Sequence, residues 1–405
     1  MRFGFRGALI AVAALAAPFA FSGRAAAQGT ARSLDLDTSV RSLGRGGASV
    51  AAFWDGGSEW VNPSLLGYRN GLSFTWDRHE LVPEIADNVM LSSRRLSLGL
   101  WGVGFSTAGK PIDVLGGTDL DYGVTVETDA AGNPIATSRS YEHIRSWSLG
   151  VSAATVFDQV AARFGNGTRL SDWADVAVGG SWKRVELALN PPQTFSTDAT
   201  DVGLLVRLSP LDTRRSSGSA GGRTHRVDLA YGHAVLNSNN PEIDFGLFGG
   251  PVPTSRLERD GGSIGWTVRF APDELARSGR LRRIAGPDGA MLRVLAARDW
   301  EHVSAGSNDA SSRDVDRWGT EFDFGRVAAF RTGHVSDREG GILGYAWGFG
   351  LGAPLGPLGE LSYDFSSTPQ AGGLDNRNSQ SITLRLDVLA TLKSWREEAP
   401  HAPAR

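Results

Sequence analysis

Residues 263–270 read SIGWTVRF, and the regular alternation of side chains in this stretch sets the fold class. Every second side chain is apolar, the set being Ile264, Trp266, Val268 and Phe270. The side chains between them are small or polar and end in a charge at Arg269. Successive side chains of a β-strand point to opposite faces, so the stretch predicts a strand with one apolar and one polar face.

The same period of two recurs from about residue 72 onward, for example in RLSLGLWG (95–102) and SWSLGVSA (146–153). We predict about fourteen strands, near 72–81, 94–106, 119–128, 139–156, 174–189, 200–209, 225–237, 262–271, 291–304, 314–325, 327–336, 341–352, 358–367 and 379–390. Most reach the ~9–11 residues with which a tilted strand crosses a bilayer. Strands of soluble sandwiches more often have ~5–6 residues.

The polar faces of these segments carry charges of both signs in near balance. We predict that they line a lumen, the residues being Arg207, Arg226, Asp228, Arg269, Glu321, Asp323, Glu360, Asp364, Arg385 and Asp387. The apolar faces would then contact lipid, as in an all-β transmembrane antiparallel barrel. The alternative is a soluble barrel with its apolar faces inward. Strand length, strand number and the need to close sheet edges favour the membrane barrel.

Composition excludes several other classes. Glycine, at 52 of 405 residues, exceeds its usual ~7% share, which suits many strands and tight turns. Cysteine is absent, so neither disulfides nor thiolate metal sites hold the fold. The formal charge of −3 is dispersed and gives no support for nucleic-acid binding. We predict no cofactor and no metal.

The N-terminus has the three parts of a secretory signal peptide. Basic residues precede an apolar run, ALIAVAALAAPFAF (8–21), and small residues follow up to Ala27. The run is shorter than the ~20 residues of a transmembrane anchor, which is the alternative. We therefore expect export to the outer membrane of a Gram-negative type of envelope. The predicted organisation is a signal peptide (1–27), an N-terminal plug (28–70), a barrel (71–390) and a polar tail (391–405).

An even strand number places both termini on one side, the periplasm. Long connections at 157–173, 210–224 and 272–290 then fall on the periplasmic side, and 273–286 has the composition of a short helix with a basic face. A missed hairpin is the competing explanation. The apolar parity changes near 185–189, which indicates either a β-bulge or a strand leaving the membrane.

A second stretch, LGRGGASVAAFWDGGSEWVNPSLLG (43–67), is too glycine-rich for a helix and too interrupted for one strand. A barrel of about fourteen strands has a lumen too wide for its own side chains to fill. A segment just before the first strand is well placed to plug it. The candidate plug residues are Gly44, Gly46, Gly47, Trp54, Asp55, Trp60, Asn62 and Pro63. The glycines allow close approach to the wall or a positive φ, the Asp55 turn and the Asn-Pro break redirect the chain, and the tryptophans fill volume.

This stretch resembles the start of the FadL-like and PorV/PorQ outer-membrane barrels, which carry a "GGA-x-VA" segment followed by an "NPA-x-L" break. The matching residues are Gly46, Gly47, Ala48, Val50, Ala51, Asn62, Pro63 and Leu65, with Ser64 in place of the usual alanine. Residues 318–352 also resemble the PorV/PorQ pattern of strand, tight turn and glycine-aromatic strand.

The PorV/PorQ resemblance implies an accessory of protein secretion, of the type IX kind, or of surface attachment. Its partners would be outer-membrane lipid and secretion machinery or secreted cargo. The alternative is a FadL-like channel for hydrophobic small molecules, with the plug as gate. A structural barrel without flux is the third possibility.

The sequence contains no pair of acidic and histidine residues placed to act together in catalysis. Glu142 and His143 are neighbours and Asp299 and His302 differ in parity, so each pair points to opposite strand faces. The glycines at 44–47 lack the preceding strand and following helix of a phosphate loop. We predict no enzyme activity and no catalytic residue.

Overall fold

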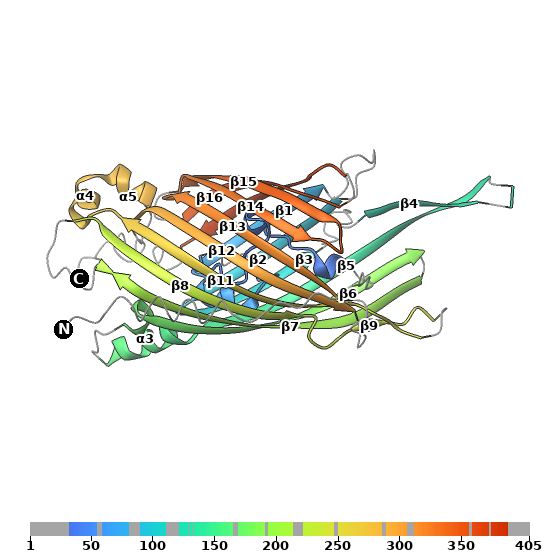
Figure 1. The fold of residues 1–405 in the computed structure, drawn as a ribbon, viewed down its shortest axis with the longest axis horizontal. Coiled ribbons are helices and arrows are strands. Elements are labelled where there is room, and N and C mark those ends of the chain that lie inside the picture. Colours follow the sequence, from blue (N-terminus) through green and yellow to red (C-terminus); the bar gives the residue numbers. More distant parts are fainter. Residues whose placement is uncertain are drawn as a thin grey trace, which may run out of the picture.

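In the computed structural model the chain forms a closed antiparallel β-barrel, elongated along the strands (Figure 1). The structure describes residues 32–54, 59–80, 90–110, 121–128, 130–131, 133–164, 169–190, 193–213, 222–246, 250–285, 289–305, 312–355, 359–371 and 374–387. The predicted signal peptide, Asp55 of the candidate plug and the predicted tail lie outside these residues.

Fourteen strands form the wall, and each pairs with two neighbours. They are β1 (Gly71–Glu80), β2 (Met90–Leu100), β3 (Val103–Lys110), β5 (Pro134–Ser152), β6 (Ala174–Asn190), β7 (Gln193–Asp212), β8 (Thr224–Leu236), β11 (Ser255–Arg269), β12 (Ala290–Ala305), β13 (Arg313–Phe324), β14 (Ala328–Asp337), β15 (Ile342–Pro354), β16 (Gly359–Thr368) and β17 (Arg377–Leu386). β17 pairs with β1, and β3 pairs with both β2 and β5, which closes the ring.

The predicted number of strands is correct, but two of the predicted segments are wrong and their errors cancel. Segment 94–106 contains the end of β2 and the start of β3, joined by a two-residue turn at Trp101 and Gly102, with φ of 55° and 83°. Tryptophan is an unusual turn residue at positive φ, so the sequence carries no common turn signal there.

Segment 119–128 contains β4 (Asp121–Thr128), which pairs only with β5 and extends beyond the ring (Figure 1). β3 runs parallel to β1 and ends at Lys110, at the barrel end opposite to the end of β17.

Helical connections gather at one end of the barrel (Figure 1). α3 (Ala153–Arg163), η3 (Leu170–Asp172), α4 (Pro272–Arg277) and α5 (Gly279–Ala285) lie at the end where β1 begins and β17 finishes. The long connections thus fall on the same side as the C-terminal end of the wall, and the helix expected at 273–286 is present as two short helices. β9 (Glu242–Ile243) and β10 (Val252–Pro253) form a small hairpin at the other end.

Among the helices that the structure describes, none combines the length and the apolar character needed to cross a membrane.

The wall points its apolar face outward. In β11, Ile264 is 50% and Trp266 41% exposed, whereas Ser263 and Thr267 are buried. The same outward pattern includes Leu96, Leu98, Trp147, Leu149, Phe330 and Trp347 on other strands. Apolar side chains outside and polar ones inside are the pattern of a barrel that spans a bilayer, and the soluble alternative is wrong.

The parity change at 185–189 is not a bulge, because β6 keeps one register with β5 from Ala177 to Ala188. In this part of β6, Val185 and Leu187 are buried inside the barrel, while Arg184 is exposed on its outer face. The strand has left the apolar outer band, so its outer face is polar and its inner face packs a core. Of the two interpretations, the exit from the membrane band holds.

The outward band generates a stability prediction. Ile264→Arg should lower the free energy of unfolding by about 2–4 kcal/mol, because it places a charge near the bilayer midplane. Leu343→Arg, at the start of β15 and 70% exposed, should cost at most about 1 kcal/mol. Denaturant unfolding of the barrel in phospholipid vesicles measures both. Equal effects would contradict the bilayer-spanning orientation.

Candidate functional site inside the barrel

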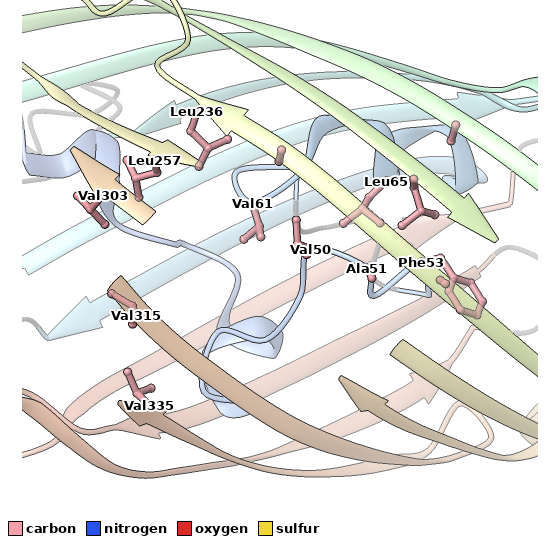
Figure 2. Packing of buried hydrophobic residues seen from close by; sticks show 14 residues of the cluster. Val50, Ala51, Phe53, Val61, Leu65, Leu236, Leu257, Val303, Val315 and Val335 are labelled. Atoms are coloured by element: carbon pink, nitrogen blue, oxygen red, sulfur yellow. The ribbon is translucent and has the colours of Figure 1, made fainter. Parts of the chain in front are cut away.

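The segment before β1, residues 32–70, is called the N-terminal segment below, and its described residues, 32–54 and 59–70, lie within the ring of strands. It contains η1 (Arg32–Asp35), α2 (Val40–Gly44) and η2 (Pro63–Tyr68). Figure 2 shows Val50, Val61 and Leu65 of this segment surrounded by wall strands. They pack in one cluster with the wall residues Leu236, Leu257, Val303, Val315 and Val335. The centre of the barrel is therefore occupied by chain and not by solvent.

Glu321 of β13 is the centre of a buried charge cluster. Its carboxylate accepts hydrogen bonds from Arg41 (2.6 Å) and Arg45 of the N-terminal segment and from Arg331 of β14 (2.9 Å). Arg41 also pairs with Asp323 at 2.6 Å. Arg45 is fully buried and Glu321 is 1% exposed. Such a cluster anchors the segment, since removing one member leaves a desolvated charge without compensation.

A second set of contacts fixes the backbone of the N-terminal segment. The Asp299 carboxylate on β12 accepts from the amides of Ser49 (2.5 Å) and Val50 (2.8 Å). The Asn62 amide donates to the carbonyl oxygens of Val50 (2.8 Å) and Leu204 on β7 (3.1 Å). The bonds at Ser49 and Val50 satisfy backbone groups that lie outside secondary structure, which a buried irregular segment requires, and the bond to Leu204 ties Asn62 to the wall.

Wall glycines make room for this backbone. A Cβ added at any of them would collide with or press against the N-terminal segment, and we call this set the glycine belt: Gly99, Gly104, Gly150, Gly179, Gly203, Gly232, Gly319, Gly333 and Gly348. Its first five members are direct cross-strand neighbours from β2 to β7. At Gly179 the added carbon would lie 2.5 Å from the amide nitrogen of Ser64. Much of the high glycine content thus serves close approach rather than turns.

Of the candidate plug glycines, Gly44 ends α2, and Gly46 and Gly47 follow directly after the helix. Gly46 and Gly47 have φ of 68° and 82°, values that L-residues other than glycine rarely adopt. Gly44 lies against β15, where an added Cβ would be 3.4 Å from the Cα of Gly348.

Asn62 and Pro63 begin a helix rather than a strand. Asn62 is extended and its side-chain oxygen accepts from the amide of Ser64 at 3.0 Å, so it caps η2, and Pro63 stands at the first turn. The first strand begins at Gly71, close to its predicted start near residue 72.

The two candidate tryptophans lie at different heights in the barrel. Trp60 is 4% exposed and has the Lys183 ammonium 5.1 Å from its ring centroid. Trp54 packs edge-to-face on Phe53 at 5.2 Å, with the Arg293 guanidinium 6.0 Å from its ring. Both fill space inside the ring.

The predicted lumen charges all lie on the inner side of the wall, in two groups. Glu321, Asp323 and Asp364 belong to the buried cluster, where Asp364 accepts from Arg331 at 2.6 Å. The others border or approach a cavity of about 460 Å³ beneath the N-terminal segment, at the end that carries the helices. Its lining includes Arg207, Arg226, Asp228, Arg269, Arg385 and Asp387, while Glu360 pairs with Arg385 at 2.8 Å.

Several residues that matter here were absent from the predicted site. Arg41, Arg45 and Arg331 complete the Glu321 cluster, and Asp299 binds backbone amides. The signal that could have found the first two is two arginines within an otherwise small and apolar stretch that was expected to lie inside a barrel. Asp299 carries no such signal.

The weak catalytic pairs stay apart. Asp299 faces the N-terminal segment, whereas His302 bonds the exposed Asp314 at 2.8 Å. Glu142 is fully buried, whereas His143, its neighbour on β5, is half-buried. Within the described residues no three His, Cys, Asp or Glu side chains come together as metal ligands.

Comparisons with known proteins find similarity at the level of structure. The barrel is similar to the crystal structure of a FadL homologue of Pseudomonas aeruginosa (TM-score 0.37, 10% identity, 87% of this chain and 98% of that chain). It is also similar to the toluene transporter TbuX of Ralstonia pickettii (0.38, 13%, 85% and 97%) and the toluene transporter TodX of Pseudomonas putida (0.34, 11%, 80% and 90%). No protein-family model matches the chain, and no curated protein matches it in sequence.

The glycine belt generates a prediction with a built-in control. Gly179→Ala should destabilise the barrel by about 1–3 kcal/mol, because the new carbon overpacks against Pro63 and Ser64. The neighbouring Gly180→Ala should have little effect, since its added carbon would meet only a carbonyl oxygen at 3.4 Å. Thermal unfolding in detergent, together with tryptic cleavage at Arg41 and Arg45, measures barrel stability and release of the segment. Equal behaviour of the two variants would contradict the steric role of the belt.

Proposed function

We propose that the chain is an exported outer-membrane channel for hydrophobic small molecules and that the N-terminal segment is its gate. The exterior supports the membrane location, because the apolar band encircles the wall. The proposed organisation is the one expected from the sequence: signal peptide 1–27, plug 28–70, barrel 71–390 and tail 391–405. The solute class is the one for which TbuX and TodX are named, but the proposal rests on the interior of this chain.

The observation that carries the proposal is an apolar cluster inside the half of the barrel away from the helices. Leu34 and Trp60 of the N-terminal segment pack on Ile144, Val185 and Leu187 of the wall. Phe195 and Phe245 border the same cluster. If the segment moves, it uncovers this apolar cluster, and the charges of Lys183 and Asp201 beside it are paired with each other at 2.6 Å. A channel for ions or sugars would instead present polar groups, because a polar solute must exchange its water for hydrogen bonds.

The charge cluster supports the role of the N-terminal segment as a gate. The arginines at 41 and 45 tie the segment to Glu321, and Arg207 lies 5.5 Å from the ring of Phe53. These contacts are between side chains, so they can break without unfolding the wall. The cavity beneath the segment gives space for a displaced chain or a passing solute. The plug residues named from the sequence, from Gly44 to Pro63, are the proposed moving part.

Glu321→Gln should open the barrel, because three arginines then surround a neutral group and breaking such a buried cluster costs about 3–5 kcal/mol. We expect frequent opening events in single-channel recordings, against few in the wild type. Asp316→Asn on the same strand is the control, since its pair with Arg298 is exposed, with side chains 40% and 56% accessible. Surface pairs contribute at most about 1 kcal/mol. If Glu321→Gln shows no more opening events than Asp316→Asn, the proposed role of the Glu321 cluster in holding the gate closed is contradicted.

Deletion of residues 43–67 should give a large stable conductance in planar bilayers and rapid entry of an apolar fluorescent probe into proteoliposomes. The Asp316→Asn barrel at equal density is the control for leakage. Conductance equal to that of the intact chain would count against a plug. A large conductance without entry of the apolar probe would support the plug but contradict hydrophobic small molecules as the transported solutes.

A second candidate is a barrel of PorV/PorQ type that serves secretion or surface attachment without flux. The observation that favours it is the deep burial of the N-terminal segment: Arg45, Val50, Asn62 and Leu65 are fully buried within the ring. Its other support is the sequence resemblance at 43–67 and 318–352. Co-purification separates the two candidates. Recovery of secretion proteins with the barrel favours the accessory role, whereas an apolar molecule retained in the interior favours the channel.

A further inference from the structure

An apolar groove of about 450 Å³ lies on the outer surface of the barrel, between α3 and the β2–β3 hairpin. It is separate from the interior site. On the wall side its lining is apolar throughout, consisting of Leu98, Leu100, Trp101, Val103 and Phe105. Three of these, Leu98, Val103 and Phe105, are 40–45% exposed. Figure 1 shows α3 at the end of the barrel where the chain's short helices gather.

The helix side of the groove is held rigidly. The amide of Ser152 donates to the carbonyl of Gly102 at 2.7 Å, which ties α3 to the hairpin turn. The amide of Ala154 donates to Asp175 of β6 at 2.9 Å. Further along, Asp158 accepts from the amide of Leu170 at 2.6 Å, which joins the helix to the loop that follows it. The groove is thus a built feature of the wall.

The helix is amphipathic: Ala154 and Ala161 are buried against the protein, whereas larger apolar side chains in the helix and directly after it are exposed. Phe157 is 53%, Val160 50% and Phe164 84% exposed. Val156, Gln159, Val160 and Arg163 are the helix residues that line the groove. Their spacing of three and four residues places them on one face. An apolar face with a basic residue in its last turn is typical of a helix lying at a membrane surface.

We propose that this groove binds one glycerophospholipid of the periplasmic leaflet, with an acyl chain along the wall and the phosphate at the Arg163 guanidinium. The inference rests on the proposed outer-membrane location. A dry cavity of about 150 Å³ holds a benzene molecule, so a groove three times larger has room for a long stretch of acyl chain. Arg163 supplies the complementary charge, because a guanidinium binds phosphate oxygens in a forked geometry. Gln159 adds an amide donor beside it.

Native mass spectrometry of the full-length barrel tests the proposal. The protein is purified in detergent micelles that contain dioleoyl phosphatidylglycerol, and bound lipid is counted after collisional release of the micelle. We expect one phospholipid to stay on the wild type. Val160→Trp fills the groove while keeping the helix apolar, so its retained lipid should fall by about tenfold or more. Phe157→Trp, on the exposed face outside the groove, is the matched control and should retain the lipid.

The headgroup contact has its own pair of variants. Arg163→Gln should lower lipid retention by about tenfold, whereas Arg169→Gln, in the following loop, should not. Equal loss in Val160→Trp and Phe157→Trp, or a detergent molecule in place of the lipid, would overturn the groove as a lipid site. Insertion of each variant into liposomes is measured separately. A barrel that inserts but holds no lipid refutes only this inference, whereas one that fails to insert refutes the proposed location.

Discussion

The close approach of an irregular backbone to the inner wall is the constraint on which the rest of the structure depends. The glycine belt allows the N-terminal segment to lie against nine strands, and at Gly333 even one added carbon would meet the amide of Gly46 at 2.6 Å. A buried segment without sheet or long helix needs partners for its backbone groups. Asp299, Asn62 and Ser263 supply them. The belt glycines therefore provide the space, while Asp299 and Ser263 of the wall and Asn62 of the segment itself provide the hydrogen bonds.

The buried charge cluster around Glu321 fixes the position of the N-terminal segment along the wall. Glu321 accepts from arginines of both the N-terminal segment and the wall, and it does so in a place that water hardly reaches. A buried cluster of this kind adds little net stability but strongly disfavours any arrangement that leaves one charge alone. The glycines set how near the segment lies, and Glu321 sets where along the wall it lies.

The fold could be predicted from the sequence because period-two alternation is a local signal, which is clear in residues 263–269 of β11 and 381–386 of β17. Prediction failed where local signals were weak or ambiguous. The turn at Trp101 was missed because tryptophan is rare at positive φ. The sequence of β4 alternates like that of a wall strand, although β4 pairs on one side only. The phase change near Val185 marks the point where β6 extends beyond the apolar outer band. The height of a residue relative to that band follows from the folded barrel and not from the local sequence.

The candidate site was predictable only in part for the same reason. The glycines and the Asn-Pro break mark residues 43–67 as unusual, and their positive φ values agree with that expectation. The partners of the segment lie far away in the chain: Arg41 and Glu321 are 280 residues apart. Nothing in a single strand distinguishes Glu321, which binds two arginines of the segment, from Glu360, which pairs with arginines at the cavity.

The tight contact between the glycine belt and the N-terminal segment also restricts the order of assembly. The segment is joined directly to β1, which is one side of the seam with β17, and the closed ring leaves no gap through which a folded insert could be threaded. The segment must therefore either be in place before the seam closes or enter through an open end of the barrel as an unfolded chain. In the first order of events, the residues that are exported first act as the template around which the last strands pair.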